Sequence, residues 1–526
     1  MTTVDVIVAG AGHNALITAA YLARAGLEVL VLEARPTVGG GTSTEELIPG
    51  YRIDTASTGH NGILANPLLT DDELGLRSRY GLDYVIPDPA NRLVLPDGEV
   101  VTTWLDVDRT VAELARLSPS DARTYRHMLD DWDGVKRIFG RAQAAPVGWG
   151  PAVDEELAGV PGGGVWRRRK ALSAWDVVHH EYEDPRVRAY VLWAVAQSLT
   201  AIDQPGSGLL AAAAPAGRQV RSWPIPVGGS SALPEALVRA IEDDGGTIVC
   251  DARVTRLLVE DGRCTGVETA DGTRYHARRA VVSSIHVKHL LEMAPAEIWP
   301  DDFTYGVRTL DVGLSIFVLH LATDRPPLLP GAEDAPVAAA SGIAGWPDEM
   351  LRGVRAVRDG LTPDPLPSIL IGTPSAVDPG RAPDGQHTVK YVLAAPAKGP
   401  EPGVTWDEGK EAFADRVFET VRARVPNMTS DAVLGRVAFS PTDLGRWNAH
   451  MIDGTAHGGD RGLPFSGPLR PAPGWAQHRM PIEGLYQTGG TTHPGGSVTG
   501  FPGRNAATVV LRDLGHELTE VVASGR

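Results

Sequence analysis

The sequence has few cysteines, no long apolar run and no excess of basic residues. It contains two cysteines, Cys250 and Cys264, in 526 residues. This excludes a disulfide framework and argues against a cysteine-based zinc or iron–sulfur site. No run reaches the roughly 18 apolar residues that a membrane-spanning helix needs, and the first residues lack the basic start and apolar region of a secretory signal. Together these absences predict a cytoplasmic protein.

Negative charge exceeds positive charge. The chain has 65 Asp and Glu residues against 49 Lys and Arg residues, so its formal net charge is −16. Nucleic-acid phosphates require clustered cations, so this balance argues against a nucleic-acid partner. An apolar share of 43% is typical of a globular protein, and the length suggests more than one domain.

The chain up to Glu33 predicts a βαβ unit. A short apolar run from Val4 to Ala9 predicts a strand buried on both faces. Apolar residues then recur at helical spacing from His13 to Arg24, and a second apolar strand ends at Glu33. Such crossovers are almost always right-handed, which places the two strands side by side in a parallel sheet.

The turn of this unit has the pattern of a dinucleotide site. Gly10 permits the tight turn, Gly12 lets the backbone approach a pyrophosphate, and the small Ala15 allows helix and strand to pack closely. The helix N-terminus, with His13 and Asn14, directs free amides and its positive dipole end at the phosphates. Glu33 then accepts hydrogen bonds from a ribose hydroxyl and disfavours NADP. The alternative is a glycine-rich turn that merely packs.

Two further glycine clusters favour FAD over NAD. One follows Glu33 directly and comprises Ala34, Arg35, Gly40, Gly41 and Thr42. Here Arg35 is expected to reach a phosphate or the ribose, or else to be a solvated surface residue. The other cluster, residues 489–503, opens a second helix. Two helix N-termini directed at one ligand suit the longer, more anionic flavin dinucleotide.

These segments are far apart in the chain, which predicts a discontinuous domain. We expect an α/β fold, with a Rossmann-type FAD-binding domain and an inserted α+β substrate domain that includes a helical cap. The FAD-binding domain is assigned residues 1–70, 221–300 and 476–526, and the substrate and cap domain residues 71–220 and 301–475. Residues 140–165 are expected to contain a loop rich in Gly and Pro.

The same motifs resemble a known family. Gly10 to Glu33, Gly39 to Thr42, and Tyr486 to Ala507 resemble the phytoene desaturase-like FAD-dependent oxidoreductases. Within that family the chain is most similar to the branch of the pyridine nucleotide-disulphide oxidoreductase domain-containing protein 2 type. The resemblance implies an extended FAD and the removal of a hydride, as a dehydrogenase or desaturase, from an apolar or amphipathic small molecule.

The resemblance also implies specific FAD contacts. It places Gly10, Gly12, Glu33, Gly40 and Gly41 along the ADP and ribityl side. It further implies contacts from the residues Val254, Gly489, Gly490, Gly496, Val498 and Thr499. Of these, Val254 would meet adenine through its backbone, although a core valine in a strand is an equal alternative.

Catalytic side chains are weakly indicated. The sequence shows no Ser-His-Asp set, no cysteine nucleophile and no clearly spaced carboxylate pair, and hydride transfer needs none of them. A base is needed to take the accompanying proton, and the candidates are His493 and His457. The alternatives are that His493 braces the turn before Pro494 and that His457 is a satisfied loop residue. No metal site is predicted, because no histidine pair recurs with a third ligand.

Other features leave alternatives open. Trp132, Trp149, Trp166, Trp175 and Trp193 would line a substrate channel, touch a membrane or pack in a core. The run of cations after Trp166 would contact anionic lipid at a membrane periphery or be a solvated helix end. With no second dinucleotide fingerprint, electrons are expected to leave to oxygen, a quinone or another carrier. A flavin amine or alcohol oxidase and a redox-neutral isomerase remain alternative functions, and the oligomeric state is not predicted.

Overall fold

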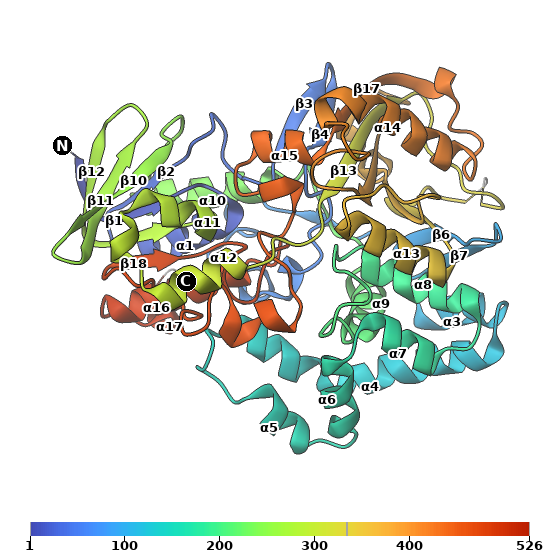
Figure 1. The fold of residues 1–526 in the computed structure, drawn as a ribbon, viewed down its shortest axis with the longest axis horizontal. Coiled ribbons are helices and arrows are strands. Elements are labelled where there is room, and N and C mark those ends of the chain that lie inside the picture. Colours follow the sequence, from blue (N-terminus) through green and yellow to red (C-terminus); the bar gives the residue numbers. More distant parts are fainter. Residues whose placement is uncertain (1, 333–334, 525–526) are drawn as a thin grey trace.

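The computed structural model describes residues 2–332 and 335–524 and contains two large sheets (Figure 1). The first sheet lies near the N-terminus and has seven strands. In spatial order they are β10 (Val254–Glu260), β11 (Arg263–Thr269), β12 (Arg274–Ser283), β1 (Thr2–Ala9), β2 (Val29–Leu32) and β9 (Thr247–Val249), with β18 (Leu485–Gln487) paired to β12. Its core is parallel, since β1 pairs in parallel with both β12 and β2.

Helices cover both faces of this first sheet. Val6 and Val8 of β1 point into a cluster with the helices on one face, while Ile7 and Ala9 point into a second cluster on the other. This two-sided burial is why β1 is a continuous apolar run. The helices involved are α1 (His13–Arg24), α10 (Ala232–Asp243), α16 (Phe501–Asp513) and α17 (Leu518–Ser524) on one side, and α11 (Val287–Leu290) and α12 (Asp301–Thr309) on the other.

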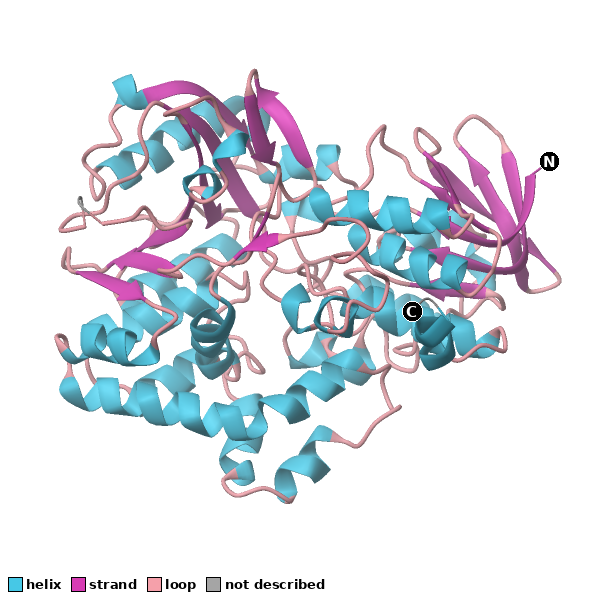
Figure 2. Cartoon of the chain, turned by 180° about the vertical axis from the view of Figure 1, so that it is seen from behind, coloured by secondary structure: helices cyan, strands magenta, loops and turns pink. Residues whose placement is uncertain are grey.

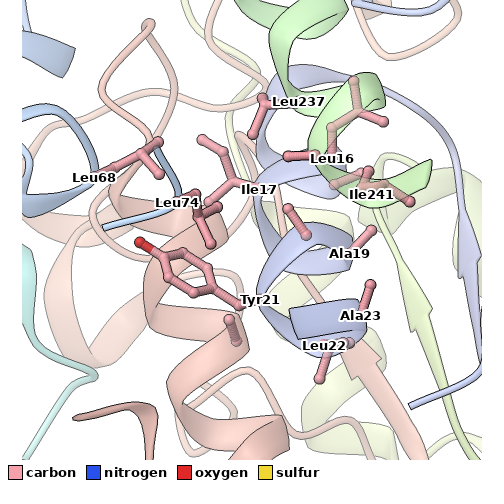
Figure 3. Close-up of a cluster of buried hydrophobic side chains, with 14 of the residues drawn as sticks. Leu16, Ile17, Ala19, Tyr21, Leu22, Ala23, Leu68, Leu74, Leu237 and Ile241 are labelled. Atoms are coloured by element: carbon pink, nitrogen blue, oxygen red, sulfur yellow. The ribbon is translucent and has the colours of Figure 1, made fainter. Parts of the chain in front are cut away.

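Helix α1 is the centre of this packing. Figure 3 shows Leu16 and Ile17 of α1 beside Leu237 of α10 and Leu74. Tyr21 of α1 lies in the same cluster and donates a hydrogen bond to the Glu73 carboxylate at 2.5 Å. The helical spacing of its apolar residues therefore packs α1 against one face of the first sheet.

The second sheet also has seven strands and is mainly antiparallel. In spatial order they are β17 (Val433–Phe439), β13 (Ile316–Thr323), β16 (His387–Ala394), β15 (Ser368–Gly372), β14 (Ala340–Ala344), β6 (Asn91–Val94) and β7 (Val100–Thr103). The strand β6 pairs in parallel with β14, about 250 residues later in the chain, as the match of Ser341 with Arg92 shows. A hairpin of β3 (Thr44–Ile48) and β4 (Tyr51–Asp54) packs on this sheet, and β5 (Tyr84–Val85) pairs with β8 (Ile225–Pro226).

A helical layer lies under the second sheet, along the lower edge of the molecule seen from behind (Figure 2). Its members are α3 (Val107–Ala115), α4 (Pro119–Ala144), α5 (Val153–Ala158), α6 (Gly163–Ala171), α7 (Ala174–Glu181), α8 (Pro185–Ala196) and α9 (Leu210–Arg221). The remaining helices are α2 (Pro67–Thr70), α13 (Pro347–Arg358), α14 (Trp406–Arg422) and α15 (Pro441–Trp447). This layer is the helical cap that the sequence predicts.

The predicted fold class agrees with this architecture. The Gly/Pro-rich loop predicted within residues 140–165 lies at residues 145–152, between α4, which ends at Ala144, and α5, which begins at Val153. The Asp106 and Ser118 side chains cap α3 and α4, and Pro119 stands in the first turn of α4, which starts that long helix. Within the described residues, no helix is long and apolar enough to cross a membrane.

Candidate functional site

A cavity of about 730 Å³ lies between the two sheets, and both contribute to its wall. The first sheet supplies the turns after β1, β2 and β12 and the start of β10, while the second supplies residues of β13, β15 and β16. Such a size suits a small-molecule site. The cavity runs from a glycine-rich end at the first sheet to an apolar arm beneath α13.

The glycine-rich end is a cradle of backbone. Helix α1 begins after Gly12, and no side chain in the described part of the chain caps its first amides. A Cβ at Gly12 or at Gly41 would meet no described atom within 4 Å, whereas one at Gly40 would lie 3.2 Å from the Gly12 Cα. Gly10 has a φ of 97°, which only glycine adopts readily. Space for a ligand therefore remains beside Gly12 and Gly41, while the two turns are in close contact with each other at Gly40.

Glu33 fixes the relative position of the two glycine turns. Its Oε2 accepts from the Ala11 amide at 2.6 Å and its Oε1 from the Arg35 amide at 2.9 Å. The Gly39 amide donates to the Ala11 carbonyl at 2.8 Å. The predicted residues Gly10, Gly12, His13, Asn14, Ala15, Glu33, Ala34, Arg35, Gly40 and Gly41 all line the cavity.

Two residues at this end that are predicted to contact FAD also contact other parts of the protein. The Arg35 guanidinium pairs with Glu45 at 2.6 Å and lies 4.3 Å from the Trp447 ring, so it is not a solvated surface residue, and its contact with a phosphate or the ribose stays a prediction. Val254 lines the cavity and its side chain is buried in the core, so it is a core valine, and its contact with adenine stays a prediction.

The C-terminal glycine cluster forms the opposite wall. Gly489, Gly490, Gly496 and Val498 line the cavity. A Cβ at Gly496 would lie 2.3 Å from the His457 carbonyl, so this turn sits directly on the residue 457 loop. Helix α16 then meets the start of α1, where the Gly503 amide donates to Asn14 Oδ1 at 3.2 Å.

Two predicted residues are turned away from the cavity. Thr42 is fully buried and donates to the Gly39 carbonyl at 2.7 Å. Thr499 is absent from the lining, and its carbonyl accepts from Asn66 Nδ2 at 2.9 Å. Both residues therefore form hydrogen bonds that support the glycine turns on the side facing away from the cavity.

The structure separates the two histidine candidates. His493 is not among the lining residues, and its Nε2 donates to the Ala142 carbonyl of α4 at 2.8 Å, so it braces the turn. His457 lines the cavity, and its Nε2 donates to the Ser198 carbonyl at 3.0 Å. That bond leaves Nδ1 with its lone pair, and Nδ1 has no partner among the described residues. Burial, with the nearby Arg461, holds the pKa of His457 well below its usual range.

The apolar arm and its one lysine were not predicted. Met350, Val354 and Val357 of α13 line the arm, with Leu366 from the following loop. Lys390 of β16 enters from the second sheet. A signal for it exists in the sequence, since a lysine interrupts an otherwise apolar strand.

Other sequence features have structural roles. Among the five tryptophans of the helical segment none lines the described cavity, and Trp132 stacks on Phe139 at 5.5 Å. After the buried Trp166, the cations Arg169 and Lys170 pair with Glu181 and Asp154, which gives no support to the predicted lipid contact. Across residues 2–332 and 335–524, no group of three His, Cys, Asp or Glu residues could hold a metal ion.

Comparisons with known proteins agree with this geometry. The model of the family described as flavin containing amine oxidoreductase matches residues 16–510. The chain is 29% identical to the mouse pyridine nucleotide-disulfide oxidoreductase domain-containing protein 2, over 97% of this chain and 94% of that one. It is 26% identical to the lycopene-forming phytoene desaturase of Pantoea ananas, over 96% and 99%.

A solved structure gives the same result for the fold. An oxidoreductase from Methanosarcina mazei superposes with a TM-score of 0.61 at 15% identity, covering 97% of this chain and 100% of that chain. The predicted fold class and the resemblance to phytoene desaturase-like proteins are therefore confirmed. The backbone cradle, with room where side chains would stand, fits the cofactor that the family implies. The chain belongs to the flavin-containing amine oxidoreductase family, and it is an FAD-dependent oxidoreductase.

Proposed function

We propose that the protein is a dehydrogenase or desaturase that removes a hydride from an apolar or amphipathic small molecule. The observation that carries this proposal is the continuity of the cavity, which joins the glycine-rich cradle to an arm walled by Met350, Val354, Val357 and Leu366. A substrate held in that arm is in contact with apolar side chains along most of its length, which excludes water from the reacting carbon.

The cradle residues are the proposed FAD ligands. Bound FAD supplies the acceptor for the hydride. The amides at the start of α1 and the turn at Gly40 and Gly41 would hold the pyrophosphate, because they line the cavity at a positive helix end that no described side chain caps. Glu33 would hold the ribose, and the backbone around Val254 the adenine. Gly490 and Val498 would pass along the side nearer the substrate.

His457 is the proposed proton acceptor. Its Nδ1 is buried, has no hydrogen-bond partner among the described residues, and belongs to a ring whose tautomer is fixed by the bond to Ser198. A neutral imidazole in this position takes a proton as the hydride leaves. His493 is proposed to have no such part, because its ring is directed at α4.

The proposed domain division follows from the same geometry. Residues 1–70, 221–300 and 476–526 would form the FAD-binding domain, and 71–220 and 301–475 the substrate and cap domain. The first group supplies all seven strands of the first sheet, which supports this division.

Anaerobic mixing of purified holoenzyme with candidate substrates tests the proposal. Bleaching of the flavin absorption together with a more unsaturated product is expected. Product without bleaching would identify an isomerase, and oxygen consumption with peroxide from an amine panel would identify an amine oxidase. After bleaching, recovery on addition of oxygen or of a quinone identifies the class of electron acceptor.

A further inference from the structure

Two half-buried arginines beside the cavity have no acidic partner among the described residues. Arg218 and Arg221 end helix α9 and form no ion pair with any residue in the described part of the chain. Burial lowers the pKa of Arg218 to about 9, with a further contribution from the neighbouring Arg221. Arg221 Nε is buried and has no hydrogen-bond partner among the described residues. Withdrawing a cation from water without a counter-charge costs free energy, and a bound anion would offset that cost.

Arg218 orients the side chain of Asn61, a residue of the cavity wall. Its Nη1 donates to Asn61 Oδ1 at 2.6 Å and to the Ser222 carbonyl at 3.3 Å. Its guanidinium lies 3.8 Å from the Trp223 ring. Asn61 and Trp223 both line the cavity. Because Oδ1 is held by Arg218, the Asn61 amide group presents its Nδ2 donors elsewhere, and no described residue accepts from them.

A further cation lies on the other side of the same segment. Lys390 Nζ donates to the Asp54 carbonyl at 3.0 Å, to the Ala56 carbonyl and, at a long 3.5 Å, to Thr58 Oγ1. The Asp54 carboxylate is not free for Lys390, since Arg381 Nη1 donates to it at 2.5 Å. The segment 54–61 therefore runs between Lys390 and Arg218.

Among the described residues, none with a carboxylate side chain lines the cavity at this wall. The cavity lining includes two acidic residues, Glu33 and Glu292, which lie at the glycine-rich end near β2 and β10. We propose that the wall formed by Asn61, Trp223 and Lys390, with Arg218 behind it, is a subsite for an anionic group of the substrate, so that the substrate is an apolar molecule with a carboxylate-type head. Asn61 donates to the anion, and Arg218 is a positioning residue that orients the amide and supplies charge.

This inference rests on the proposed function and narrows its substrate class to apolar molecules with an anionic head. An anion bound at this wall provides the counter-charge that Arg218 lacks among the described residues, while the apolar arm takes the rest of the molecule. A cationic substrate would meet like charge at the same wall, which disfavours amines.

Three probes that share one alkyl chain test the subsite: octanoate, octan-1-ol and octylamine. Each is titrated into purified holoenzyme, and the dissociation constant is read from the change in the flavin absorption spectrum. We expect octanoate to bind about tenfold more tightly than octan-1-ol and octylamine to bind most weakly. Equal affinities, tighter binding of octylamine, or no binding of octanoate would overturn the proposal. Protein that cannot be loaded with FAD would instead refute the proposed function.

Two variants address the residues. Asn61→Asp keeps the shape of the side chain and gives Arg218 a carboxylate partner, so it should raise the melting temperature and abolish the preference for octanoate. Arg218→Met should abolish the same preference while leaving octan-1-ol affinity and FAD content unchanged. Arg188→Met is the matched control, because Arg188 also bonds backbone carbonyls on a helix but lies outside the cavity lining.

The pattern among these variants decides the outcome. Loss of the octanoate preference in N61D and R218M, with its retention in R188M, supports the proposal. If R218M does not fold, N61D alone gives the result, since it removes no contact. An unchanged preference in N61D, or an equal loss of affinity for all three probes or for FAD, would overturn the subsite and assign these residues to the cofactor or to the fold.

Discussion

Replacing Arg381 by methionine should strongly destabilise the protein. The Arg381 side chain is fully buried and joins three segments of chain. It donates to Asp54 Oδ2 at 2.5 Å, to Asp378 Oδ2 at 2.8 Å and to the Pro226 carbonyl at 2.8 Å. Removing it leaves two buried carboxylates without their cation. Breaking a buried pair in this way costs about 3–5 kcal/mol of unfolding free energy.

A second substitution, at Asp54, should recover part of the unfolding free energy lost in R381M and serves as the internal control. Asp54 Oδ1 keeps its bonds from the Ser230 amide at 2.9 Å and Thr44 Oγ1 at 2.7 Å. If the cost comes from stranded charge, Asp54→Asn in the R381M background should restore stability by about 1–3 kcal/mol. Asp54→Asn in the wild-type background should instead destabilise.

Urea unfolding, followed by tryptophan fluorescence and by circular dichroism, measures these differences. R381M should also lower FAD content, because Asp54 begins the segment 54–61 that lines the cavity. An unfolding free energy for R381M within about 1 kcal/mol of wild type, or a second substitution that destabilises R381M further, would refute the account of this charge cluster.

Three further predictions concern the cavity. Gly12→Val should keep the fold, since its φ is −67° and no described atom lies within 4 Å of an added Cβ, but should weaken FAD binding at least about tenfold in an equilibrium titration; unchanged affinity would contradict the cradle. His457→Gln should lower the rate constant of flavin reduction about 100-fold in stopped-flow measurements, whereas His493→Gln should leave it unchanged. The reverse order would contradict the assignment of His457 as the proton acceptor. Burial lowers the pKa of Lys390 to about 8 from 10.5. The unfolded chain therefore binds more protons between these values, and wild-type stability relative to K390M should rise from pH 8 to 10.5 in urea titrations; a falling difference would contradict it.

The glycine-rich end of the site was predictable because its signals are local. Gly10, Gly12 and Glu33 lie in one βαβ unit, where strand, helix and turn are each specified by neighbouring residues. The turn at Gly40 follows within a few residues, and the Gly39 amide ties it to Ala11. Local chemistry of this kind depends little on the rest of the fold.

The apolar arm was not predictable because it depends on pairing between distant strands. Lys390 reaches the cavity because β16 lies between β13 and β15, and Asn61 is oriented by Arg218 from a helix more than 150 residues later. Lys390 does interrupt an apolar run in the sequence, but no local signal places its strand beside the cavity or orients Asn61. His493 shows the converse limit: its glycine-rich surroundings place it near the cofactor site, but the direction of its ring is set by Ala142 of α4.

The decisive measurement is the flavin content of the purified protein. We expect one tightly held FAD per chain, retained on gel filtration or restored by reconstitution, with loss of that flavin in G12V despite an unchanged circular dichroism spectrum. Protein that is colourless, cannot be reconstituted with FAD and yet is folded would contradict that expectation.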